Sequence, residues 1–280
     1  MSNVQRPHVP FAMKKASIAS SRSSLSLLAG ACIAIAILAG CESRGNAAET
    51  TSATQETSPD DFRPLFNGED LTGWQIPEGD GGHWKVVDGV IDYDAESEAE
   101  EDKSLWTEEE FGDYVLRIDW RIKEVSYVNP SVPIIKADGT HKRDENGEFM
   151  TMSMPDSDSG IIPRGHGKGQ ANIWNWPYGS GEIYGYRMDE NMPPEVRAAA
   201  VPKINADNDI GEWNTFEITV RGQRMNVVLN DMLVIDNALL PEIPERGPIG
   251  LQHHGAMENG EWVSPPALVQ FRNISINELD

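Results

Sequence analysis

Residues 158–187 carry the highest density of side chains able to bind or transform a small molecule. If residues 170–176 form a strand, alternation puts Gln170, Asn172, Trp174 and Trp176 on one face of a sheet. Aromatic rings pack against the C–H groups of sugar rings, while amides bond to sugar hydroxyls. Tyr184 follows in the same stretch. The pattern predicts a carbohydrate-binding face; the alternative is that the tryptophans are core residues and the amides lie at a strand edge.

Short acidic motifs raise the separate question of a metal ion. Asp156 and Asp158 lie in DSDSG, and DNDIG (207–211) has a similar composition. Neither has the spacing of an EF-hand loop, and such residues are also common in turns. The glycines of GHGKG (165–169) do not lie between a strand and a helix, so no NAD site is predicted. The sequence requires no cofactor, and a structural Ca²⁺ at Asp156 and Asp158 stays an alternative.

Period-two alternation indicates that β-strands position these residues. Residues 114–122 and 216–220 alternate apolar with charged or polar side chains, which is typical of strands with one buried face. Residues 84–93 and 225–235 are expected hairpins that turn at Asp88-Gly89 and Asn230-Asp231. The apolar phase of residues 267–276 changes, which indicates two covered faces or a bulge near Asn273.

Few segments resemble helices, and residues 193–201 are the best candidate. Many strands joined by glycine- and proline-rich loops predict an all-β fold, a two-sheet antiparallel jelly-roll sandwich, with a closed barrel as the alternative. Two polar segments interrupt the strands. We expect residues 94–104 to be a solvated loop and residues 136–158 to be a long loop that borders a site.

Seven motifs follow one another along residues 62–280. They are LFNGEDLTGW (65–74), WKVVDG (84–89), DSGIIPR (158–164), GEWNTFEITVRG (211–222), VVLND (227–231), GPIGLQHHG (247–255) and FRNISI (271–276). With these motifs residues 62–280 resemble the 3-keto-disaccharide hydrolase family. The resemblance implies a concanavalin A-like jelly roll, in agreement with the strand pattern. It also implies action on glycosides already oxidised to a ketone at carbon 3.

That substrate implies a particular set of catalytic groups. The ketone acidifies the hydrogen on carbon 2, so a base can form an enediolate and the substituent on carbon 1 can leave. A site for this reaction needs a base, an electrophile beside the enolate oxygen and an acid for the leaving group. Where the family has a Tyr-Glu-x-Gln strand, this chain has Gly169–Asn172 with Gln170 in place of the carboxylate. The base is therefore expected elsewhere.

Three residues are the catalytic candidates that this resemblance suggests: Glu182, His254 and Arg164. Histidine has an intrinsic pKa suited to acid–base chemistry near neutrality. Arg164 follows the Asp158–Ile161 stretch that corresponds to the family's Asn-Ser-Gly-Ile motif, and it would face an oxyanion or a hydroxyl. Gln252 shares a face with His254 by alternation and is expected to bind substrate.

The N-terminal 40 residues have the features of a bacterial lipoprotein signal peptide. Basic residues precede an apolar run that ends in Leu38-Ala39-Gly40-Cys41. Cleavage before Cys41 and acylation of its thiol would anchor the protein in a lipid bilayer. Residues 41–61 lack large apolar side chains up to Asp61 and are expected to be a flexible tether. The predicted location is the cell envelope, facing the periplasm, with the outer membrane favoured over the inner.

Composition limits the partners of the domain. The formal net charge is −22, and residues 1–40 contain four basic and no acidic residues, so processing makes the chain more negative. This charge argues against nucleic acid as a partner. Three hypotheses are open: an enzyme that cleaves 3-keto-glycosides, a non-catalytic carbohydrate-binding lipoprotein module, and a protein-binding lipoprotein with an acidic surface.

Overall fold

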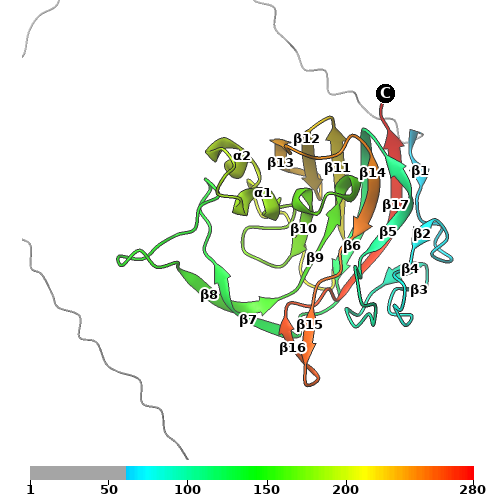
Figure 1. The fold of residues 1–280 in the computed structure, drawn as a ribbon, viewed down its shortest axis with the longest axis horizontal. Helices are drawn as coiled ribbons and strands as arrows, with labels where there is room; N and C mark the ends of the chain where they lie inside the picture. The colour runs from blue at the N-terminus through cyan, green and yellow to red at the C-terminus, as the bar shows by residue number, and fades with distance from the viewer. Residues whose placement is uncertain (1–60) are drawn as a thin grey trace, which may run out of the picture. The chain divides into compact units, whose positions relative to one another are not determined.

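The computed structural model describes residues 61–280, and their largest element is an eight-stranded antiparallel sheet (Figure 1). The strand order is β13-β12-β11-β6-β17-β4-β3, and β1 pairs with β17. The strands are β1 (Arg63–Pro64), β3 (Lys85–Val87), β4 (Val90–Asp92), β6 (Tyr114–Ile122), β11 (Asn214–Arg221), β12 (Arg224–Leu229), β13 (Met232–Leu239) and β17 (Val269–Glu278).

A second sheet of five strands has the order β10-β9-β14-β5-β2. Its strands are β2 (Trp74–Gln75), β5 (Leu105–Phe111), β9 (Asp158–Ile162), β10 (Ala171–Trp174) and β14 (Gly247–Leu251). Two separate hairpins are β7 (Tyr127–Pro133) with β8 (Thr151–Asp156) and β15 (Ala256–Glu258) with β16 (Glu261–Ser264). The helices are α1 (Tyr184–Met188) and α2 (Pro194–Ala199), with 3₁₀ turns η2 (Pro163–Gly165) and η3 (Gly167–Gly169).

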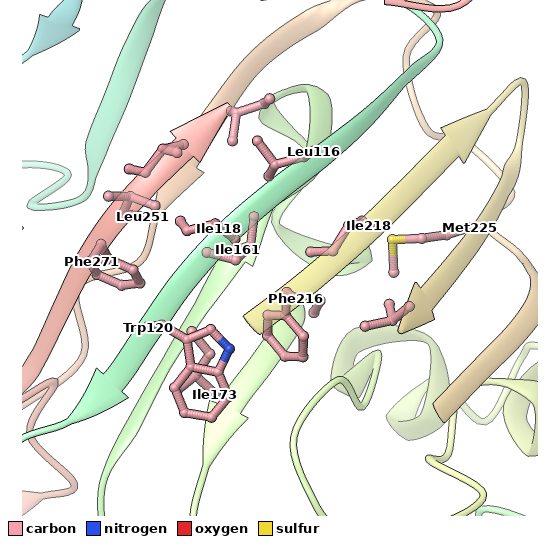
Figure 2. Packing of buried hydrophobic residues seen from close by; sticks show 14 of the residues in the cluster. Leu116, Ile118, Trp120, Ile161, Ile173, Phe216, Ile218, Met225, Leu251 and Phe271 are labelled. Carbon is pink, nitrogen blue, oxygen red and sulfur yellow. The ribbon is translucent and has the colours of Figure 1, made fainter. Parts of the chain in front are cut away.

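The two sheets enclose one hydrophobic core. Figure 2 shows side chains of β6, β11, β12 and β17 next to those of β9, β10 and β14, all belonging to one buried cluster. Leu116, Ile118 and Trp120 are buried, while the intervening Arg117 and Asp119 are more exposed, as the alternation predicts. The jelly-roll sandwich is therefore confirmed, and the closed barrel is wrong because the strands form two separate sheets.

The turn residues have the conformations expected from their types. Asn230 and Asp231 have φ of 49° and 66° between β12 and β13, and Asp88 has φ of 51° between β3 and β4. Gly89, which follows Asp88, also has a positive φ, of 78°. The pairs Asp88-Gly89 and Asn230-Asp231 therefore both suit two-residue hairpin turns. Near the end of the chain, Asn273 has φ of 51°, and the register of β17 against β6 shifts between Arg272 and Ser275. The predicted bulge is confirmed.

The long loop expected over residues 136–158 is in part β8 and belongs mostly to a hairpin of residues 127–156, here called the arm. β7 and β8 pair with each other, and the chain between them continues as bridges between Ile135 and His141 and between Arg143 and Phe149. Figure 1 shows this hairpin lying apart from both sheets of the sandwich, with its connecting segment passing beside α2. Val132 and Ile135 of the arm pack on Trp174 and Trp176 in a second small core.

Two other predictions need adjustment. Residues 94–104 have no regular structure, but Ala95, Ser97 and Ala99 are buried while the intervening acidic residues are exposed. This segment is thus packed on one side and not a fully solvated loop. The helix predicted over residues 193–201 is α2, whereas the short helix α1 was not predicted.

The predicted signal peptide (1–40), the acylated Cys41 and the tether lie outside the described residues, apart from Asp61 at the end of the tether. Within residues 61–280, no helix is both long enough and apolar enough to cross a bilayer. These described residues belong to one compact unit.

Candidate active site

A pocket of about 330 Å³ lies beside the first residue of β9 and the last residue of β10, and the arm, α1 and the segment around His254 complete it. Residues directly opposite in the β9–β10 pair point to the same face, so Asp158 shares a face with Trp174, and Ile161 shares the other face with Ala171. Because Ile161 and Ala171 belong to the core, the pocket lies on the outer face of the five-stranded sheet. Its lining is Asn129, Ser131, Pro133, His141, Asp156, Asp158, Trp174, Trp176, Tyr184, Arg187, Met188, His254 and Pro265.

The predicted aromatic residues all line this pocket, but they differ in exposure. Trp174 and Trp176 stack with centroids 3.9 Å apart, and they are only 1% and 8% exposed because the arm packs on them. Their indole N–H groups donate to the Gly179 carbonyl and to Asp156 Oδ1, each at 2.8 Å. Tyr184 is 41% exposed. The tryptophans therefore mainly hold the arm against the five-stranded sheet. Tyr184 has the aromatic ring that a ligand in the pocket can reach.

His254 and Asp158 are neighbouring titratable side chains that both line the pocket. His254 Nδ1 donates to the carbonyl oxygen of Pro265 at 2.6 Å, since a carbonyl can only accept. In the neutral imidazole the lone pair then lies on Nε2, which is 3.8 Å from Asp158 Oδ2. Asp158 Oδ1 is buried without a hydrogen-bond partner. Burial raises the pKa of Asp158 to about 6, although nearby His254 opposes the rise. This carboxyl can therefore exchange a proton near neutrality.

Asp156, at the end of β8, is a bound carboxylate rather than a free one. Its Oδ2 accepts a hydrogen bond from Asn129 Nδ2 at 2.7 Å, and its Oδ1 accepts the Trp176 indole N–H. Burial raises its pKa, and these two bonds oppose the rise. Asp156 thereby ties together the two strands of the arm and Trp176.

A buried ion pair forms another part of the site. Arg187 Nε donates to Glu182 Oε1, and both side chains are 0% exposed. Arg187 Nη1 donates to His141 Nε2 at 3.1 Å, because a guanidinium has only donors. Arg187 lines the pocket and its Nη2 has no hydrogen-bond partner, whereas Glu182 does not line the pocket. Burial raises the pKa of Glu182, and the adjacent guanidinium opposes that rise.

The predicted amides form a cluster beside the pocket but do not line it. Gln170 Nε2 donates to Asn172 Oδ1 and to Gln252 Oε1, the latter at 2.7 Å. A Cβ at Gly160 would lie only 2.5 Å from Gln170 Nε2, so glycine at this position makes room for the cluster. Gln170 and Asn172 are 8% and 3% exposed, and their amides bond to each other. Because neither residue lines the pocket, they make no direct contact with a ligand there in this conformation.

Arg164 lies away from the pocket, in contrast to its predicted role. Its guanidinium donates to the carbonyl oxygens of Gly112, Gly222 and Pro244 and to Asp113 Oδ1. The residue is 2% exposed and has φ of 48°. Arg164 therefore stabilises the fold, because its donors already bond to the connections between strands. We do not include it in the site.

The structural Ca²⁺ considered at Asp156 and Asp158 stays a prediction. Among residues 61–280 no three or more His, Cys, Asp or Glu side chains converge as a metal would require. In the DNDIG motif, Asp207 accepts hydrogen bonds from the backbone N–H and hydroxyl of Ser180. Asp207 therefore serves a loop connection, and Asp156 and Asp158 serve the pocket.

Sequence reasoning missed Arg187 and His141. Arg187 lies in the dense stretch that was singled out, but its sequence gives no sign that it, rather than Arg164, reaches the pocket. His141 lies in a polar segment with no recognisable motif, and only the folding of the arm brings it to the pocket.

Fold and site together define a jelly-roll domain with a histidine, an aspartate, a buried arginine and aromatic side chains in one pocket, a combination suited to carbohydrates. The chain belongs to the family of 3-keto-alpha-glucoside-1,2-lyase-like domains, whose model matches residues 61–277. This match confirms the family that the seven motifs indicated. The domain is therefore a member of a carbohydrate-active family.

The chain is similar to several solved structures. A candidate glycosyl hydrolase from Parabacteroides distasonis has a TM-score of 0.50 and 22% identity, covering 80% of this chain and 86% of that chain. A second from the same organism has a TM-score of 0.47 and 16% identity over 80% and 98% of the two chains. The carbohydrate-binding module CBM66 from Bacillus subtilis has a TM-score of 0.36 and 14% identity over 74% and 96%. No curated protein matches this chain.

Proposed function

We propose that this protein cleaves 3-keto-glycosides by removing the proton on carbon 2 of the sugar and eliminating the substituent on carbon 1. The observation that carries the proposal is the pairing of His254 with Asp158 in the pocket that Arg187 also lines. The family to which the domain belongs supports the substrate class. The reaction uses proton transfer by side chains of the chain itself and needs no cofactor.

The chemistry balances without an oxocarbenium ion. A base takes the proton from carbon 2, and the electron pair of that C–H bond forms an enediolate with the neighbouring ketone. The enediolate then expels the oxygen on carbon 1, which leaves with a proton from an acid. The product is an enone, and addition of water at carbon 1 converts elimination into net hydrolysis. Ordinary glycosidases instead use two opposed carboxylates around an oxocarbenium-like transition state.

We assign the base to His254 and the acid to Asp158. Pro265 fixes the His254 tautomer so that Nε2 is the basic atom, and it lies in the pocket beside Asp158. The raised pKa of Asp158, about 6, keeps a protonated fraction available near neutrality. Pairs of titratable groups with different environments commonly divide acid and base roles in this way.

Arg187 is the proposed electrophile for the enediolate oxygen. Its Nη2 has no partner within the described protein, and a guanidinium stays protonated at any working pH. A fixed positive charge placed where an oxyanion develops stabilises that oxyanion. Glu182, a predicted catalytic residue, acts in this proposal through Arg187, since it contacts the guanidinium and does not line the pocket.

A non-catalytic carbohydrate-binding module is the second candidate. It is favoured by Gln170, which stands where the family has a carboxylate and whose side chain is bonded to other amides. The accessible ring of Tyr184 and the polar groups of the pocket would suffice for binding a sugar.

One experiment separates the two. The full chain, purified in mild detergent, is offered a 3-keto disaccharide and its unoxidised parent, with monosaccharide release and the enone absorbance as readouts. We expect turnover of the keto form alone, and its loss in His254→Gln. The partly buried His83, which bonds to Asp94 outside the pocket, provides the control variant His83→Gln. Binding of either sugar without turnover would support the module instead.

We also propose that the protein is a lipoprotein of the bacterial cell envelope, anchored through acylated Cys41 and facing the periplasm, with the outer membrane favoured. The support is the order of basic, apolar and small residues before Cys41. Membrane fractions should contain the wild-type chain, whereas Cys41→Ser should shift it to the soluble fraction. Retention of Cys41→Ser in the membrane would contradict the anchor.

A further inference from the structure

His141 reaches the site from a part of the chain that is distant in sequence. It lies in the arm, 46 residues before Arg187, and its Nε2 accepts a hydrogen bond from Arg187 Nη1 at 3.1 Å. His141 also lines the pocket. The proposed catalytic steps give no role to a residue at this position.

The arm holds the His141 ring in a defined place. The backbone turn from Lys136 to Thr140 closes with a hydrogen bond of 2.8 Å, and His141 then bridges to Ile135. Phe149 packs edge-on against the imidazole, with ring centroids 4.7 Å apart. The neighbouring Gly139 lies so close to α2 that a Cβ there would be 2.8 Å from the carbonyl oxygen of Arg197. The ring is therefore part of a packed contact between the arm and the helical segment.

Two acceptors then fix the guanidinium of Arg187. Glu182 accepts from Nε and His141 accepts from Nη1, while Nη2 is left without a partner. A guanidinium is planar, so two bonds to different edges determine the direction of the remaining donor. Tyr184 lies over the same group, with Cζ of Arg187 5.2 Å from its ring centroid. The unpartnered Nη2 is the donor that the proposed function assigns to the enediolate oxygen.

We propose that His141 is a positioning residue that aims Arg187 into the pocket, and that it does so only as the neutral imidazole with its proton on Nδ1. The link to turnover rests on the proposed function, whereas the link between His141 and Arg187 does not. A protonated Nε2 would present a donor and a positive charge to a group that has only donors. Protonation of His141 therefore releases Arg187.

The charges around His141 favour the neutral ring. Three guanidinium groups lower its pKa, from Arg187 on α1, Arg197 on α2 and Arg143 on the arm, while Glu190 acts in the opposite direction. Burial is the largest cause that lowers the pKa of His141 below its ordinary value of 6.5, and Arg187 is the next. At neutral pH the ring is thus an acceptor, and acid below that lowered pKa disrupts the contact.

Turnover by substituted enzymes tests the positioning role. His141→Ala should lower kcat by about 10- to 100-fold, since misplacing a catalytic group by about 1 Å has effects of this size. His141→Gln, whose amide oxygen can accept from Arg187 and does not titrate, should recover at least about tenfold of that loss. The kcat of His141→Gln should also fall less steeply than that of wild type as the pH is lowered. His83→Gln is the control. Equal kcat for His141→Ala and His141→Gln, or unchanged kcat in both, overturns the role.

NMR of the full chain tests the contact independently of turnover. With ¹⁵N-labelled histidine, His141 should titrate below 6.5 with its proton on Nδ1, and its pKa should rise in Arg187→Met. Because that variant leaves Glu182 buried alone, Glu182→Leu with Arg187→Met provides a second background with no buried charge. Identical titration of His141 in wild type and both variants overturns the contact. If no 3-keto-glycoside is cleaved but the titration shifts as expected, only the proposed function fails.

Discussion

The free energy of unfolding of Asp158→Asn, compared with that of wild type, should increase as the pH rises. The wild-type carboxyl is mostly buried, its Oδ1 lacks a partner, and burial raises its pKa from 3.8 to about 6. A carboxyl whose pKa is higher in the folded than in the unfolded state binds its proton more tightly when folded. Ionisation therefore favours the unfolded chain, and Asp158→Asn removes that effect.

The size of the effect follows from the two pKa values. Each pKa unit corresponds to about 1.4 kcal/mol, so the rise from 3.8 to about 6 corresponds to about 3 kcal/mol. The side chain is 21% exposed, and water screens part of this cost, so we expect about 2 kcal/mol. The cost is absent below pH 3.8, grows between pH 3.8 and 6, and is complete above pH 6.

Urea unfolding at several pH values measures this effect. The free energy of unfolding of Asp158→Asn, minus that of wild type, should increase by about 2 kcal/mol between pH 4 and pH 7.5. Any effect of the new amide that does not depend on pH cancels when the differences at the two pH values are subtracted. Asp88→Asn, an exposed turn residue outside the pocket, is the matched control. If the difference in unfolding free energy stays constant or decreases over this range, burial does not raise the pKa of Asp158 as argued.

Three further predictions concern the surroundings of the pocket. Glu182→Gln should reduce the free energy of unfolding at pH 8 by about 3–5 kcal/mol, because it leaves the Arg187 charge buried and uncompensated; a loss under 1 kcal/mol in urea unfolding would contradict this. Gly160→Ala should destabilise the protein by about 1–3 kcal/mol in the same assay, since its Cβ would overlap Gln170. Trp176→Ala should make residues of the arm exchange amide hydrogens faster than the core strands, because it removes a stacked ring and a bond to the arm; unchanged protection would show that the arm is held otherwise.

The strand pattern of this chain could be predicted well from its sequence because the signals are local. Alternation gave β6 from Tyr114 to Ile122, and turn pairs that tolerate positive φ gave the hairpins at Asp88 and Asn230. The phase change near Asn273 gave the bulge in β17. Each of these features depends on residues within a few positions of one another, so no knowledge of distant contacts was needed.

Of the residues proposed for the site, the sequence supplied His254 and Tyr184 but confused two arginines. Arg164 and Arg187 are both surrounded by polar residues in the chain, and only packing decides their roles. Arg164 is bound by three carbonyl groups from distant loops, while Arg187 meets Glu182 and lines the pocket. A guanidinium can serve either purpose, so residue type alone did not discriminate between them.

The sequence by itself determined the fold class, the family and the strand face shared by Asn172 and Trp174, whereas the structure placed Asp158 beside Trp174. Those properties follow from alternation and from motifs that are read along the chain. Only the tertiary structure decided what fills the pocket, since the arm covers Trp174 and brings His141 to Arg187 across 46 residues. The physical reason is that a buried charge is bonded by whichever partners the packing supplies, and sequence spacing does not record those partners.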